Sequence, residues 1–175
     1  PTSHGKRIAL VSHSGGAGVL AADAATAAGL DVSALPEELR VKLAKILPDY
    51  AGFNNPLDTT GPMVFRPDIL AECLRILLTS NHYDAAVLSV KLIWRNGLEL
   101  IEELTKLRAD VDKPFAVSWV APHENVMDAI RRAPFPVFSD PARATRNISA
   151  RLLYDERRCV LLSDPRPSRD VEPSI

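Results

Sequence analysis

The chain has 175 residues, of which 46% are hydrophobic, 25% charged and 6% aromatic, and this composition is typical of one globular domain. A formal net charge of −1 excludes the basic surface that binding to nucleic acid or to an acidic membrane requires. Two cysteines exclude a disulfide framework and no apolar run is long enough to span a membrane, so we expect a cytoplasmic protein.

The N-terminal half alternates short apolar runs with helical patterns. Residues 8–12 are a predicted buried strand, because this short apolar run is bounded by glycines, and residues 31–35 are a second predicted strand. The alanine-rich residues 19–28 predict a helix. Residues 36–47 predict another, with proline at the start and acids in the first turn. Residues 54–62 are rich in asparagine and proline and are predicted to form a loop.

The C-terminal half repeats this alternation. In residues 98–107 the apolar positions are spaced by three, which indicates an amphipathic helix. Prolines begin the helical patterns near residue 67 and at residue 141. The further predicted strands are 85–90, 115–120 and 136–138, and the further predicted helices are 67–77, 98–107, 125–132 and 141–154.

Five short strands that alternate with helices predict a parallel sheet covered on both faces. Right-handed crossovers then favour an α/β, flavodoxin-like, doubly wound five-stranded sheet in a three-layer α/β/α arrangement. We expect an entry linker over residues 1–6, one domain over residues 7–158 and a C-terminal tail or linker over residues 159–175. Because the chain does not begin with methionine, we also expect it to be part of a longer protein or a processed subunit.

The strongest local signal is a glycine-rich stretch between the first predicted strand and helix. Glycines let a ligand approach the backbone, and the helix behind them presents unpaired N–H groups and the positive end of its dipole. We therefore predict a phosphate-binding site here, although a tight strand-to-helix turn explains the same glycines. The stretch matches neither the dinucleotide-binding nor the Walker A fingerprint. The predicted phosphate-binding residues are Ser14, Gly15, Gly16, Ala17 and Gly18.

A second loop is expected at the same edge of the sheet, beyond the carboxyl ends of the strands, where such folds bind ligands. Its polar side chains suit either a cleft or the cap of the next helix, and taken alone the loop is better explained as a structured turn. The expected cleft-lining residues are Asn55, Asp58, Thr59, Thr60 and Gly61. No metal site is predicted, because the four histidines and two cysteines lack the spacing of metal ligands.

Together the two loops resemble one module of the nucleoside-diphosphate-forming acyl-CoA synthetases, the relatives of ADP-forming acetyl-CoA synthetase and succinyl-CoA synthetase. In that family an Asn-Ala-Gly-Gly-Pro-Gly-Val-Leu-Ala turn follows a strand, and Leu-Pro and Asn-Pro-x-Asp-x-x-Gly motifs come later. The matching segments here are 13–21, 47–48 and 55–61. The resemblance extends over residues 6–154 and is to the second flavodoxin-like module, the counterpart of the C-terminal part of the succinyl-CoA synthetase β subunit.

This resemblance implies an enzyme that converts an acid, CoA and a nucleoside triphosphate into acyl-CoA, nucleoside diphosphate and phosphate. It implies companion CoA-binding, phosphohistidine and ATP-grasp modules, in the same chain or in another subunit. CoA, ATP or ADP, and Mg are then expected in the complete enzyme, with no cofactor bound by this domain alone. The amides of residues 15–18 would hold the phosphohistidine of a neighbouring module. The acid, the nucleotide base and the oligomeric state stay open.

The chain departs from the family pattern at two positions. Ala17 replaces the usual proline, and His13 replaces the usual asparagine. His13 is the candidate catalytic residue, and three roles stay open for it: a hydrogen-bond donor to phosphate, the phosphorylated residue itself, or a loop histidine without a role.

Two alternatives to the ligase module also stay open. One is a stand-alone domain that binds the phosphate of a flavin or nucleotide. The other is a protein-interaction domain of the same fold.

Overall fold

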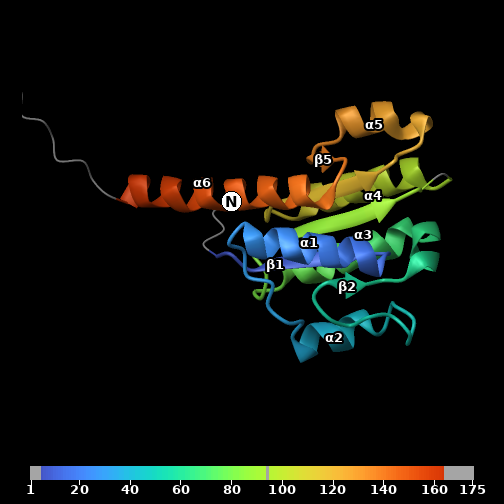
Figure 1. Cartoon of the computed structure of the whole chain (residues 1–175), viewed down its shortest axis with the longest axis horizontal. Helices are drawn as coiled ribbons and strands as arrows, with labels where there is room; N and C mark the ends of the chain where they lie inside the picture. Colours follow the sequence, from blue (N-terminus) through green and yellow to red (C-terminus); the bar gives the residue numbers. More distant parts are fainter. Residues whose placement is uncertain (1–4, 94, 164–175) are drawn as a thin grey trace, which may run out of the picture.

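The computed structural model of the chain describes residues 5–93 and 95–163. The strands are β1 (Ile8–Ser12), β2 (Leu57–Asp58), β3 (Ala85–Lys91), β4 (Phe115–Val120) and β5 (Val137–Phe138). They pair in parallel in one sheet with the order β2-β1-β3-β4-β5, and helices cover both faces (Figure 1). The predicted flavodoxin-like α/β fold of three layers is therefore confirmed.

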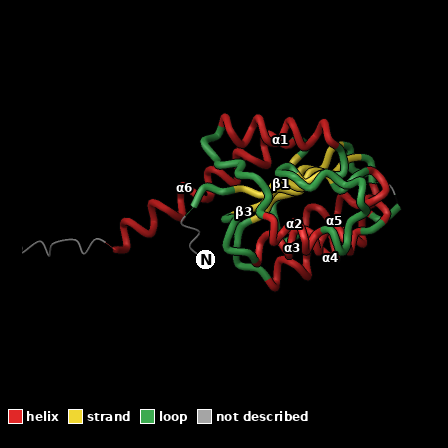
Figure 2. Tube along the Cα trace, turned by 90° about the horizontal axis from the view of Figure 1, so that it is seen from below, coloured by secondary structure: helices red, strands yellow, loops and turns green. Residues whose placement is uncertain are grey.

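The helices divide between the two faces of the sheet (Figure 2). One face carries α1 (Gly15–Ala27) and α6 (Pro141–Ser163). The other carries α2 (Glu37–Leu43), α3 (Pro67–Thr79), α4 (Gly97–Asp110) and α5 (Met127–Arg132), with the 3-10 helices η1 (Gly61–Phe65) and η2 (Glu124–Val126) in the connections. Within the described ranges, no helix combines the length and the apolar character needed to cross a membrane.

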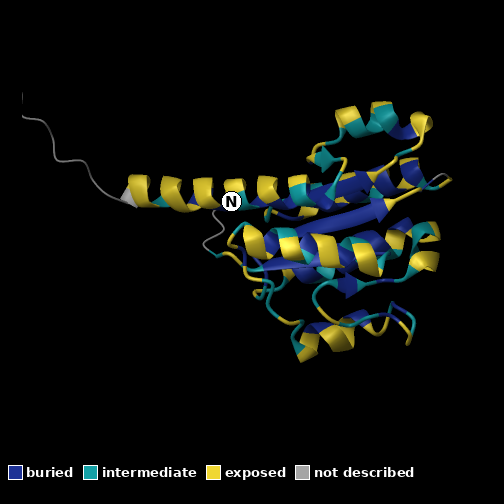
Figure 3. Ribbon diagram, viewed as in Figure 1, coloured by how far each residue is buried: buried dark blue, intermediate teal, exposed yellow. Residues whose placement is uncertain are grey.

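Strand alternation gives the sheet two separate apolar cores. In β1, Ile8 and Leu10 pack against α1 and α6, whereas Ala9 and Val11 pack against the helices of the other face. Strand β1 is buried throughout, and β3 and β4 are buried up to their last residue (Figure 3). This explains why the predicted strands are continuous apolar runs rather than alternating patterns.

The prediction of a strand over residues 31–35 is wrong. Only Asp31 forms a bridge, to Arg7, and the second strand is β2, which lies inside the predicted loop. The side chain of Asn55 explains the difference, because it occupies the edge of β1 that a longer strand would use. Its Oδ1 accepts the N–H of Leu10 at 2.9 Å, and its Nδ2 donates to the carbonyls of Ile8 at 2.8 Å and Ser33 at 2.9 Å.

Helices α1, α2 and α6 differ most from the predicted ranges. Helix α1 begins at Gly15, so the glycines form its first turn instead of a loop before it. Helix α2 ends at Leu43, and α6 continues to Ser163, past residue 154. The distal part of α6 projects from the body and is exposed (Figure 3). Residues 1–4 of the expected linker and residues 164–175 of the expected tail lie outside the described residues.

We predict that Asn55→Ala destabilises the fold. The substitution leaves the N–H of Leu10 and the carbonyl of Ile8 without the partners that they have now. An unpaired buried peptide group costs about 1–3 kcal/mol, so the free energy of unfolding should fall by about 2–4 kcal/mol. Urea unfolding followed by circular dichroism measures this change.

The neighbouring Asn54 provides the control, because its side chain is exposed. Asn54→Ala should change the free energy of unfolding by less than about 0.5 kcal/mol. Equal stability of the Asn55→Ala and Asn54→Ala proteins would contradict the structural role of Asn55.

Candidate functional site

The carboxyl end of β1 fixes the start of α1. The hydroxyl of Ser12 accepts the N–H of Ser14 at 3.0 Å and donates to the carbonyl of Ser14 at 2.9 Å. Ser14 is the N-cap residue with extended backbone, and its side chain makes no capping hydrogen bond. Intrahelical bonding begins with the N–H of Gly18, which donates to the carbonyl of Ser14 at 3.0 Å. The N–H groups of residues 15–17 are therefore without a helical acceptor.

The three glycines of this turn have different surroundings. A Cβ on Gly18 would lie 3.1 Å from Cβ of Pro56, so close packing between α1 and the second loop requires glycine there. A Cβ on Gly15 would lie 3.2 Å from Oδ2 of Asp58. Gly16 has nothing within 4 Å of its Cβ position, so a ligand can approach its backbone freely. In this turn Gly18 therefore allows close packing, and Gly16 leaves the backbone accessible to a ligand.

The second loop places Asp58 beside the start of α1. Its Oδ1 accepts the N–H of Thr60 at 2.9 Å, and its Oδ2 is the atom that lies next to Gly15. Thr59 is buried, and both its N–H and its hydroxyl donate to the carbonyl of Ser12, at 2.8 Å and 3.2 Å. Thr59 therefore joins the loop to β1, and the carboxylate of Asp58 is the loop's charged group at α1.

A shallow pocket of about 110 Å³ lies between the start of α1 and the second loop. It brings together the predicted residues Ser14, Gly15, Gly18 and Asp58. Asn55 and Thr59 instead bind the backbone of β1, and Thr60 and Gly61 do not line this pocket. The two predicted loops therefore meet, but only part of the second one faces the helix start. The pocket lining is Ser12, Ser14, Gly15, Gly18, Val19, Pro56, Leu57 and Asp58.

Strained backbone angles occur at the same edge of the sheet, after three of its strands. Thr60, Leu92 and Ala121 have positive φ angles of 71°, 52° and 51°, and they follow β2, β3 and β4 respectively. Such angles are unfavourable for residues other than glycine, above all for the β-branched threonine. The hydroxyl of Thr60 is also buried without a hydrogen-bond partner in the described part of the chain. Strain and unpaired polar groups of this kind are typical of ligand sites.

His13 is buried at this edge, with 7% of its surface exposed. Its Nδ1 has no hydrogen-bond partner among the described residues, and its ring lies against the backbone of Ser89 and Lys91. Burial lowers the pKa of His13 below its ordinary value, the Lys91 cation lowers it further, and the carboxylate of Asp58 acts in the opposite direction. His13 is therefore neutral at pH 7.

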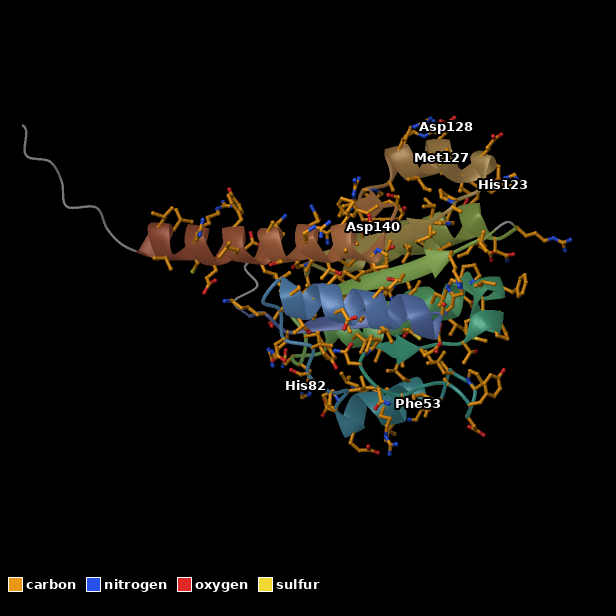
Figure 4. All side chains as sticks on the ribbon, viewed as in Figure 1. Phe53, His82, His123, Met127, Asp128 and Asp140 are labelled. Carbon is orange, nitrogen blue, oxygen red and sulfur yellow. The ribbon has the colours of Figure 1, made fainter. Side chains whose placement is uncertain are left out.

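The other described histidines lie away from the start of α1 (Figure 4). His82 lies 2.9 Å from a carboxylate oxygen of Glu38, on α2. His123 is the N-cap residue of η2, where its ring accepts the N–H of Asn125 at 3.4 Å. Both histidines therefore have local partners, which distinguishes them from His13.

The sequence analysis missed Lys91. This residue ends β3 and is exposed, and β3 pairs with β1, the strand that His13 directly follows. A signal was present in the sequence, because a lysine that directly follows the buried apolar run 85–90 marks the carboxyl end of a parallel strand.

Comparison with known proteins identifies the domain family that the chain matches. Residues 8–131 match the family model of the Ligase-CoA domain. Among curated proteins, the chain is 27% identical over 154 residues to the alpha subunit of acetate–CoA ligase [ADP-forming] I from Pyrococcus furiosus. That alignment covers 86% of this chain and 33% of the relative.

Solved structures share the fold. Acetyl-coenzyme A synthetase 1 of Candidatus Korarchaeum cryptofilum, in complex with phosphate and ADP, is 24% identical, with a TM-score of 0.77 over 95% of this chain and 37% of that one. Protein PH0766 of Pyrococcus horikoshii is 21% identical, with a TM-score of 0.78 over 91% of this chain and 38% of that one. The chain thus spans about a third of the length of the proteins it matches.

We predict that His13 makes the stability of the fold depend on pH. Its pKa is lowered in the folded state, so the unfolded chain takes up a proton first as the pH falls through about 6.5. The free energy of unfolding of the wild type should therefore decrease from about pH 7.5 to about pH 5.5. In His13→Asn this part of the decrease should be absent. Urea unfolding at both pH values measures it, and equal decreases in the two proteins would contradict the neutral, buried state of His13.

Proposed function

This chain belongs to the Ligase-CoA domain family, and from this premise we propose that it is a module of a nucleoside-diphosphate-forming acid–CoA ligase. Its task is to hold the phosphohistidine of a companion module at the N-terminus of α1 while the complete enzyme forms acyl-CoA. Companion modules bind CoA, the nucleotide and Mg, either in the same chain or in another subunit. The domain over residues 7–158 is then joined to them through its flanking segments.

The observation that supports this proposal most strongly is the group of free amides in the first turn of α1. The N–H groups of Gly15, Gly16 and Ala17 have no helical acceptor, and the hydroxyl of Ser14 does not cap them. Gly16 is open to an incoming group. Donors that are fixed in place before the reaction stabilise the negative charge of a phosphoryl group, and the helix dipole adds to this effect.

The burial of His13 favours a phosphate carrier on another module. With 7% of its surface exposed, the ring has little room to attack a phosphoryl donor in line with its leaving group. A neutral imidazole at this position is suited to donate one hydrogen bond, or to accept one. We therefore assign His13 to the surroundings of the phosphate and not to its covalent attachment.

The length of the relatives supports a division of labour between modules. The relative from Pyrococcus furiosus is an ADP-forming acetate–CoA ligase subunit, and the chain covers 33% of it. The structure from Candidatus Korarchaeum cryptofilum was solved with phosphate and ADP. We propose the same ligand classes for the complete enzyme of which this module is a part.

Substitutions of Gly16 test the proposed function in the complete enzyme. Gly16→Asp adds a carboxylate in open space, so the fold should persist while the charge repels the phosphoryl group. We expect acyl-CoA formation to fall by about 10-fold or more. Gly16→Ala adds no charge and should keep most of the activity, with a gain in stability of about 0.5–1 kcal/mol. Unchanged acyl-CoA formation in Gly16→Asp would remove α1 from the mechanism.

Labelling of the complete enzyme from γ-phosphate-labelled ATP tests where the phosphoryl group is carried. Because we place the carrier on a companion module, His13→Asn should still become labelled, and the label should be acid-labile. Complete loss of the label in a folded His13→Asn enzyme would identify His13 as the carrier and contradict the assignment above.

A further inference from the structure

Lys91 lies on the same side of the sheet as α1. Alternation along β3 puts Lys91 with Ala85 and Val87, whose side chains belong to the core beneath α1 and α6. Ser12 is the register partner of Ser89, so Lys91 lies two residues further toward the carboxyl edge, alongside the start of α1. Lys91 is thus placed at the helix end that carries the free amides.

The ammonium of Lys91 is free for a ligand. It is exposed, and no carboxylate of the described chain lies within 4.0 Å of it. Several exposed arginines, by contrast, have such a partner, as Arg40 has in Glu37 and Arg131 in Asp128. An unpaired lysine at a strand end is therefore available to an incoming anion.

His13 is an independent sign that the site lacks a ligand group. Its ring is more than nine-tenths buried, and its Nδ1 has no partner within the described chain. The Lys91 cation and the Asp58 carboxylate both act on this ring, in opposite directions. Asp58 itself touches the start of α1 at Gly15. A buried nitrogen at this place needs a hydrogen-bond partner, and a phosphoryl oxygen supplies one.

The charges explain why a cation is required. The carboxylate of Asp58 already lies at the positive end of α1, and it would repel a second anion at the same helix end. Lys91 ends the strand next to β1, and its cation acts on His13 in the opposite direction to Asp58, so it offsets that negative charge. The site then presents a neutral imidazole and three amides to a phosphoryl group.

We propose that Lys91 is a phosphate-positioning residue of this module, which together with Nδ1 of His13 and the amides of residues 15–17 forms the cradle of the phosphoryl group. This inference rests on the proposed function, and it adds a charged side chain that neither loop motif contains. Because only the charge is required at this exposed position, arginine should replace lysine with little loss, and methionine should not.

The test is a titration of the chain with inorganic phosphate at constant ionic strength, followed by the amide NMR signals of Gly15, Gly16 and Ala17. In Lys91→Met the apparent dissociation constant should rise by about 3- to 10-fold. In Lys91→Arg it should stay within about twofold of the wild type. The NMR signals of the His13 ring nitrogens should shift over the same range of phosphate concentration as the amide signals. A lysine with a purely structural role would not bring about this common shift.

Lys42 provides the matched control, because it is exposed on α2, which covers the other face of the sheet. Lys42→Met removes the same charge from the chain and should bind phosphate as the wild type does. If Lys91→Met and Lys42→Met bind equally, the role of Lys91 is overturned while the amide site of α1 stands. If phosphate does not shift the three amide signals of the wild type, the start of α1 does not bind phosphate. That result would contradict both the role of Lys91 and the proposed function.

Discussion

The structure depends on how the hydroxyl of Ser12 holds the backbone of Ser14. This side chain binds both the N–H and the carbonyl of Ser14, so the chain leaves β1 in one direction and α1 begins in one place. The Ser12 hydroxyl binds the backbone of the N-cap residue Ser14, and the Ser14 side chain makes no capping hydrogen bond. The N–H groups of residues 15–17 therefore have no helical or capping acceptor and can bind a ligand. The contact between Gly18 and Pro56 then fixes the same turn against the second loop.

The charges around this turn are balanced without a direct ion pair. Asp58 lies beside the first residue of α1, Lys91 ends the strand next to β1, and both charges act on the ring of His13, in opposite directions. Such an arrangement keeps the positive end of the helix dipole available, since neither charge neutralises the other within hydrogen-bond distance. The positive φ angles of Thr60 and Leu92 occur at the ends of the strands that flank β1. The local strain therefore coincides with the place where a ligand would bind.

Much of this architecture could be predicted from the sequence. Apolar runs identified four of the five strands, and the glycines identified the start of α1 to within a few residues. Strand β2 could not be found, because its two residues stand inside a proline-containing turn and a side chain, that of Asn55, completes the edge of β1. The spacing of apolar residues in a sequence gives no sign that a side chain, rather than a strand, binds the edge of β1. The sequence marks Lys91 as the end of a strand, but only the strand register shows that it lies next to the start of α1.

A structure of the complete enzyme in its phosphorylated state shows directly whether the start of α1 holds the phosphoryl group. We expect phosphoryl oxygens within about 3 Å of the backbone nitrogens of Gly15, Gly16 and Ala17. We also expect the phosphorylated histidine to come from outside this chain. A phosphohistidine that lies elsewhere, with the first turn of α1 covered by protein side chains, would contradict the account and leave only the fold.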